Sequence, residues 1–167
     1  NLFRRLSAPY YRAVADRLHA SGKFLAAHLD GRARGLLGCL RECEVDIADA
    51  LTPEPTGDLD AAGMREEAGD GMILSGGIST FHWLQASERD FTAHAKSWLA
   101  QKERTPRLIM SDGDQTPPGT PWERIRLLGR IVEERGRFER PGEPMAGSNP
   151  RAFHAGSLSA ENPAEVK

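Results

Sequence analysis

The chain has 167 residues, 39% of them hydrophobic and 28% charged, and its 22 Lys and Arg residues nearly balance its 24 Asp and Glu residues. The resulting net charge of −2 argues against a nucleic-acid-binding protein, because general polyanion binders carry a basic excess. The composition is that of an ordinary globular domain, and no apolar run is long enough to cross a membrane.

Short apolar runs alternate with helical patterns along the chain. Apolar residues spaced three and four apart predict a first helix over residues 8–20. Continuous apolar runs, which are typical of strands buried on both faces, cover residues 23–28, 45–51, 72–74 and 108–110. Helices are predicted after them over residues 33–40, 59–68, 88–103 and 121–135.

Several positions carry signals for the ends of these elements. Asp58 is predicted to cap the helix over residues 59–68. The final helix is predicted to begin with a capping box, in which Thr120 is the N-cap residue and Glu123 is the N3 residue that pairs with it. The same helix is predicted to end at Gly136. Gly76-Gly77 is expected to end the third strand in a tight turn, or else to let a phosphate or backbone approach closely.

The two ends of the chain differ from its middle. It begins with Asn1 rather than Met, and we therefore expect it to be a piece of a longer protein. Residues 137–167 are rich in Pro, Gly, Ser and Ala and lose all periodicity, which is typical of a mobile tail. We accordingly expect one folded part over residues 1–136 and a tail over residues 137–167.

The alternation of strands and helices predicts an α/β fold with a parallel sheet and right-handed crossovers. A small open sheet and part of a (β/α)8 barrel both fit this pattern. In either architecture, ligands bind at the carboxyl ends of the strands. Polar residues gather at these ends, namely His28 and Asp30, Asp49, Ser75, and then Ser111, Asp112 and Asp114.

His28 and Asp30 are two residues apart, so in an extended segment their side chains point the same way. They could be metal ligands or an acid/base pair. The alternatives are that Asp30 caps the next helix and that His28 is a core histidine. Asp114 lies in an Asp-Gly-Asp turn, where aspartate is also common for structural reasons.

Asp46 and Asp49 lie in an otherwise apolar strand, where an unpaired carboxylate is costly. Because they are three residues apart, they point to opposite sides, and we favour Asp49 for the site since it is nearer the strand end. The alternative is a salt bridge to a helix arginine. Cys39 and Cys43 are expected to be packing residues, and two cysteines without a disulfide framework indicate a reducing, cytoplasmic environment.

Four segments resemble one known family. They are K-F-L-A-A-H-L-D-G-R over residues 23–32, V-D-I-A-D-A-L-T-P-E-P-T-G-D over 45–58, G-D-G-M-I-L-S-G-G-I over 69–78 and D-G-D-Q-T-P-P-G-T-P-W-E-R over 112–124. Together, in this order and spacing, they resemble the uroporphyrinogen decarboxylase superfamily, which also holds the corrinoid and cobalamin-independent methyltransferases. The resemblance extends over residues 8–138.

Members of that superfamily are (β/α)8 barrels of roughly twice this length. The resemblance therefore implies that this chain is the C-terminal half of a TIM barrel, strands five to eight. It would need the N-terminal half, which in the decarboxylases carries the substrate-binding arginines and a central aspartate. A homodimer is a further expectation.

The resemblance also implies a site. Zinc-dependent methyltransferases of the superfamily use a His-x-Cys pair after the fifth strand and a Cys after the eighth, and these positions match His28, Asp30 and Asp114. A divalent, zinc-like metal held by one imidazole and two carboxylates is chemically sensible, because carboxylates suit harder or borderline ions. The decarboxylases instead have a glycine-rich segment at residues 28–32 and a Gly-His-Gly at 113–115.

Three hypotheses follow. The first is metal-assisted methyl transfer involving a small-molecule substrate at the barrel mouth, with His28, Asp30 and Asp114 as the metal ligands. Asp49 would support these ligands or contact the substrate. The resemblance also allows a corrinoid as a partner. The second is decarboxylation of a porphyrinogen or other carboxylate, with His28 and Asp114 handling protons. The third is an inactive fragment or a binding module.

Overall fold

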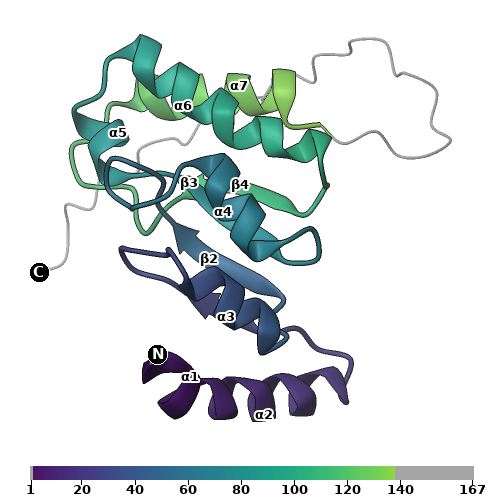
Figure 1. Ribbon diagram of the computed structural model, residues 1–167. Helices are drawn as coiled ribbons and strands as arrows, with labels where there is room; N and C mark the ends of the chain where they lie inside the picture. Colours follow the sequence, from purple (N-terminus) through teal and green to yellow (C-terminus); the bar gives the residue numbers. More distant parts are fainter. Residues whose placement is uncertain (1, 138–167) are drawn as a thin grey trace, which may run out of the picture.

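The computed structural model describes residues 2–137, so the tail predicted for residues 137–167 lies, beyond Arg137, outside the described residues. Helices and strands alternate through the described part of the chain (Figure 1). In chain order they are α1 (Leu2–Leu6), α2 (Ala8–His19), β1 (Ala26–His28), α3 (Leu36–Glu42), β2 (Ile47–Leu51), α4 (Ala61–Ala68), β3 (Ile73–Ile78), α5 (Thr80–Leu84), α6 (Glu88–Ala100), a 3₁₀ turn (Gln101–Glu103), β4 (Leu108–Asp112) and α7 (Trp122–Arg135).

The four strands form one parallel sheet in the order β1-β2-β3-β4, which confirms the predicted α/β fold. Each crossover thus moves one strand in the same direction. Because such crossovers are right-handed, they place their helices on the same face of the sheet. This arrangement is compatible with part of a (β/α)8 barrel, in which every helix lies outside the strands.

Burial along the strands agrees with a sheet that has one covered face. The residues that point toward the helices are fully buried in a core shared with α3, α4 and Trp98, namely Ala27, Ala48, Leu74 and Leu108. On the other face, four of the alternating residues are exposed or half-buried, namely Ala26, Ile47, Ile73 and Ile109. We call this second side the uncovered face.

A second, smaller core lies between α5, α6 and α7. Within this group, α6 and α7 lie side by side (Figure 1). Trp83 and Phe91 pack against each other there, with Ile78 and Ile131 around them. Cys39 and Cys43 are both buried, as their predicted packing role requires. No helix within residues 2–137 is long and apolar enough to span a bilayer.

The prediction that Gly76-Gly77 ends the third strand in a tight turn is wrong, because β3 continues through both glycines to Ile78. Their φ angles are 140° and 113°, a region that favours glycine. A Cβ on Gly76 would lie 2.3 Å from the carbonyl oxygen of Leu51, and one on Gly77 would lie 2.7 Å from Cγ of Trp98. The two glycines therefore let a neighbouring strand and a helix approach closely.

Two predicted helix caps are also wrong. Asp60, not Asp58, caps α4, and its carboxylate accepts from the N–H of Gly63 at 2.7 Å. Asp58 instead accepts from the backbone N–H groups of Ala33 and Arg34, which closes the loop before α3. Thr120 does not cap α7, because Pro121 is the residue that directly precedes this helix. The hydroxyl of Thr120 donates to the carbonyl of Pro117 instead. Gly136 does follow the helix as predicted.

The cap that Asp60 forms on α4 predicts the effect of two matched substitutions at this position. Asp60→Ala is expected to lower the free energy of unfolding by about 1 kcal/mol through loss of an N-cap. Asp60→Asn is expected to keep most of that stability, because the amide oxygen can still accept the Gly63 N–H. Urea denaturation of the two variants checks this, and equal stabilities would contradict the cap at Asp60.

Candidate metal site at the strand ends

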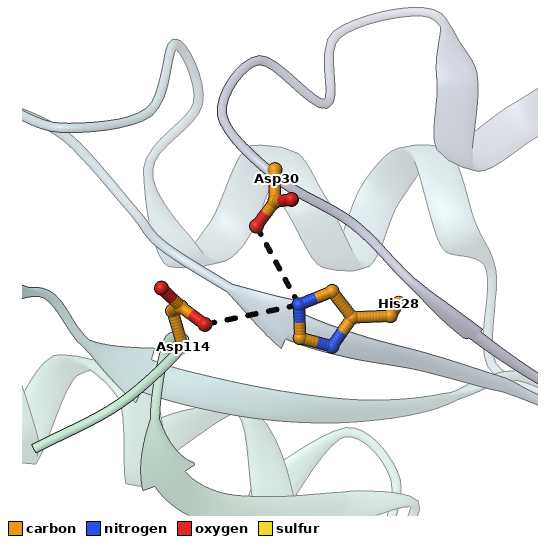
Figure 2. Close-up of side chains that lie close together, drawn as sticks. All are labelled: His28, Asp30 and Asp114. Carbon is orange, nitrogen blue, oxygen red and sulfur yellow. Dashed lines mark ion pairs between the residues drawn. The ribbon is translucent and has the colours of Figure 1, made fainter.

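The carboxyl end of β1 brings together the side chains that the sequence singled out. His28 is the last residue of β1 and lies beside Asp49 of β2 in the parallel register. Asp30 follows two residues later. Between them, the N–H of Leu29 donates to the carbonyl of Asp49, which continues the pairing with β2. Asp114 reaches the same place from the loop after β4, and Figure 2 shows Asp30 and Asp114 approaching one nitrogen of the His28 ring.

Local packing explains how the loop presents Asp114. The N–H of Gly113 donates to the carbonyl of Ile78 at 2.7 Å, which ties the loop to the end of β3. A Cβ on Gly113 would lie 2.1 Å from Cγ2 of Thr52. Only glycine fits against that methyl group. Glycine at position 113 therefore lets the loop pack closely against Thr52 and bring Asp114 to the strand ends.

His28 has a carboxylate on both sides of its ring. Nε2 lies 3.5 Å from Oδ1 of Asp30 and 3.9 Å from Oδ1 of Asp114, while Nδ1 lies 3.3 Å from Oδ2 of Asp49. The histidine side chain is 52% exposed, so it is not a core histidine. Nor does Asp30 cap the next helix, since α3 begins after Gly35 without a side-chain cap. Both structural alternatives for this pair are therefore wrong.

The chemistry of these groups suits a cation beside Nε2. A neutral imidazole has one N–H and one lone pair, whereas ionised carboxylates only accept. If Nδ1–H donates to Asp49, the lone pair of Nε2 faces two anionic oxygens. A proton or a metal ion at Nε2 would turn this repulsion into attraction.

The three groups around Nε2 fit a metal ion. One ligand atom each of His28, Asp30 and Asp114 lies within 4.8 Å of the others. Ligands of a tetrahedral zinc ion lie about 2.1 Å from it and roughly 3.4 Å from one another. Small side-chain rotations of the exposed carboxylates would close that difference. Three protein ligands also leave a coordination position for water or substrate, as in catalytic zinc sites.

Asp49 lies deeper than the other two carboxylates and is held by several donors. Burial raises the pKa of its carboxyl, but hydrogen bonds from the Ser75 hydroxyl, the Ala50 N–H and His28 outweigh burial and lower that pKa below its ordinary value. The neighbouring Ala50 has a left-handed φ of 61° where the pairing of β2 with β3 shifts register. Such a conformation costs a non-glycine residue about 1–2 kcal/mol.

Asp46 lies away from this cluster, as its three-residue offset from Asp49 predicts. Its Oδ2 lies 2.8 Å from Nε2 of His19 and accepts the N–H of Leu25 at 2.7 Å. The partner is a helix histidine, not the helix arginine considered from the sequence. Asp112 likewise points elsewhere and accepts a hydrogen bond from the Thr116 hydroxyl.

A cavity of about 140 Å³ opens beside the cluster. Asp30 and Asp114 line it, together with hydroxyl-bearing and small residues, namely Gly31, Ala50, Thr52, Thr56, Thr80 and Gly113. No lysine or arginine is among these lining residues. The cavity thus joins acidic groups and hydroxyls at the strand ends, where ligands bind in parallel α/β folds.

Sequence reasoning did not assign roles to two groups of residues. Ser75 was only one polar residue among several at the strand ends, and its hydroxyl lies 3.4 Å from that of Ser111. The rings of His82 and His94 stack with centroids 3.7 Å apart, although these histidines are twelve residues apart on different helices and share no motif. Neither histidine lines the cavity described above.

Comparisons with known proteins identify the family and the fold. A family model described as "Uroporphyrinogen decarboxylase (URO-D)" matches residues 1–135. Among solved structures, a methyltransferase from Methanosarcina mazei is similar with a TM-score of 0.62 and 21% sequence identity, over 79% of this chain and 36% of that one. At this identity the similarity shows a shared fold, and the present chain spans 36% of the other's length. No curated protein matches the sequence.

Proposed function

This chain belongs to the uroporphyrinogen decarboxylase family, and we propose that it is the part of a metal-dependent enzyme that holds a divalent, zinc-like ion with His28, Asp30 and Asp114. The observation that carries the proposal is that three carboxylates surround one imidazole, two of them on the Nε2 side. We infer that the reaction is methyl transfer, an inference supported by the fold shared with a methyltransferase.

Each residue has a distinct part in this proposal. His28 binds through Nε2, and Asp30 and Asp114 supply the two oxygens that neutralise a dication. Asp49 accepts the N–H of Nδ1 and thereby keeps the Nε2 lone pair directed at the site. The hydroxyls of Thr52 and Thr80 line the adjoining cavity, where they can orient a small polar substrate. When bound, the metal would supply Lewis acidity that polarises a substrate heteroatom.

The proposed enzyme is larger than this chain. We propose that residues 1–136 form strands five to eight of a (β/α)8 barrel, because the sheet runs in sequential order and its uncovered face carries a layer of apolar residues at Ala26, Ile47, Ile73 and Ile109. The other barrel half would cover that layer and pair with the outer edges of β1 and β4. A homodimer of this chain and a corrinoid-carrying partner are further parts of the proposal.

Metal binding by the 167-residue chain tests the proposed site. Equilibrium dialysis against Zn²⁺ is expected to give one bound ion per chain, and His28→Ala is expected to weaken binding by at least about 100-fold, since it removes a ligand outright. Asp30→Asn and Asp114→Asn are expected to weaken it as well, because an amide carries no charge to offset the dication.

His19→Ala is the matched control, because His19 also lies beside an aspartate, Asp46, but outside the cluster. It is expected to bind zinc like the wild type. Absence of stoichiometric zinc in the wild-type chain, or equal affinities for the His28 and His19 variants, would refute the metal site.

Decarboxylation is the second candidate function, and the matching family model favours it. His28 and Asp114 would then move protons at the cavity without a metal. A carboxylate-rich substrate would need cationic groups, and none of the residues lining the cavity supplies one. Decarboxylation of a porphyrinogen that persists in the presence of a strong chelator would favour this candidate over metal-assisted methyl transfer.

A further inference from the structure

Two loops at the strand ends line the cavity beside the candidate metal site. The β1–α3 loop (residues 29–35) contributes Asp30, and the β2–α4 loop (residues 52–60) contributes Thr52 and Thr56. Asp30 is also one of the three residues that could hold a metal ion. The position of its carboxylate therefore depends on how the first loop is held against the second.

The β2–α4 loop is closed on itself and fixed to the core. The side chains of Pro53 and Leu59 are buried, and the N–H of Glu54 donates to the carbonyl of Leu59 at 3.0 Å. A Cβ on Gly57 would lie 2.0 Å from the carbonyl oxygen of Thr52, so the two arms of this loop are in close contact. Such a loop can serve as a fixed support for its neighbour.

The β1–α3 loop, in contrast, is held mainly by contacts with other elements. Its residues are exposed or half-buried except for Ala33, which is 2% exposed. The N–H of Leu29 donates to the carbonyl of Asp49, which fixes the beginning of the loop. The N–H of Gly35 donates to the carboxylate of Glu67 at 2.7 Å, which fixes its end.

Asp58 connects the two loops between these points. Its Oδ1 accepts the N–H of Ala33 at 2.9 Å and the N–H of Arg34 at 3.2 Å. The guanidinium of Arg34 in turn donates to the carbonyl of Asp58. Hydrogen bonds to an ionised carboxylate are stronger than those between neutral groups. Since Leu29 directly precedes Asp30 and Ala33 follows it by three residues, Asp30 lies on a short span that is fixed at both ends.

We propose that Asp58 is a positioning residue whose carboxylate holds the β1–α3 loop against the β2–α4 loop and thereby places Asp30 beside His28 and Asp114. The consequence for metal affinity rests on the proposed function. The order of the loop does not, because both hydrogen bonds of the Asp58 carboxylate belong to the metal-free chain. Asp60 is the matched control, since it is an aspartate of the same loop but caps α4 instead.

Amide hydrogen exchange in the metal-free chain, resolved by residue with NMR, is the first readout. Asp58→Ala is expected to speed exchange at Ala33 and Arg34 by about 10-fold relative to the amides of β3, as loss of a hydrogen bond to a charged group implies. Asp58→Asn is expected to keep both amides protected, because the amide oxygen can still accept from them. Asp60→Ala is expected to speed exchange at these two amides no more than in β3, since it removes only a helix cap.

Zinc affinity is the second readout. Asp58→Ala is expected to weaken Zn²⁺ binding by about 10-fold, at the lower end of the range for groups that orient a ligand, with Asp58→Asn and Asp60→Ala close to the wild type. Unchanged exchange at Ala33 and Arg34 in Asp58→Ala, or equal losses of zinc affinity in Asp58→Ala and Asp60→Ala, would overturn the inference. If the wild-type chain bound no zinc, the proposed metal site would fail, and the exchange rates would still decide whether Asp58 holds the loop.

Discussion

Gly77→Ala is expected to lower the free energy of unfolding by at least about 3 kcal/mol. Two effects combine. The new Cβ would lie 2.7 Å from Cγ of Trp98, a fully buried ring whose indole N–H is bound to the carbonyl of Ile109, so the ring cannot move away freely. The φ of 113° is also one that alanine rarely adopts. A loss of this size is a large fraction of a domain's total stability.

Gly71→Ala is the matched control, since a Cβ there meets no atom within 4 Å. It is expected to be neutral or slightly stabilising, through the reduced entropy of the unfolded chain. Urea denaturation of the two variants and the wild type measures the difference. If Gly77→Ala were as stable as Gly71→Ala, the close packing of β3 against α6 described above would be wrong.

The stability of the fold is expected to fall as the pH drops from about 6.5 to about 4, because of the stacked pair His82 and His94. Burial is the main reason that the pKa of His82 is lowered to about 4. The charges of His94 and Arg124 lower this pKa as well, and the carboxylate of Asp90 opposes the shift. Burial also lowers the pKa of His94, whose Nε2 donates to the carbonyl of Gly77 at 2.5 Å.

The sign follows from which state binds the proton. In the unfolded chain both histidines titrate near 6.5, so between that value and the folded pKa the unfolded state binds more protons. Their contribution is therefore intact above the unfolded pKa and is lost as the pH falls through the window. For His82 alone the total is on the order of 3 kcal/mol.

His82→Gln removes this titration while an amide can still hydrogen-bond the Ser79 hydroxyl, which lies 2.8 Å from Nδ1 in the wild type. Chemical denaturation at a series of pH values should then show a flatter profile for this variant than for His19→Gln, in which the buried pair is intact. Equal slopes for the wild type and His82→Gln between pH 6.5 and 4 would rule out the buried pair as the source.

Much of the fold could be predicted from patterns that depend on a single strand or helix. The apolar runs at residues 45–51 and 108–110 indicated β2 and β4 because strands buried in a parallel sheet need such runs. The extent of β3 could not be predicted, because Gly76 and Gly77 serve contacts with Leu51 and Trp98 that exist only in the folded chain. The same is true of Asp58, whose partners at the start of α3 lie 24 and 25 residues away.

The site shows the same division. Parallel strands bring their carboxyl ends to one edge, so the meeting of His28, Asp30 and Asp114 could be predicted once the strands were placed. The left-handed conformation of Ala50 and the register shift between β2 and β3 could not, because they depend on how the two strands pair.

The central proposal, a metal ion held by His28, Asp30 and Asp114, is tested most directly by anomalous diffraction at the zinc absorption edge from crystals of the zinc-loaded chain. The expected result is one anomalous peak about 2.1 Å from Nε2 of His28 and from one oxygen of each aspartate. Zinc bound elsewhere, for example at Cys39 and Cys43, or a His28 ring with no peak beside Nε2 at saturating zinc, would contradict it.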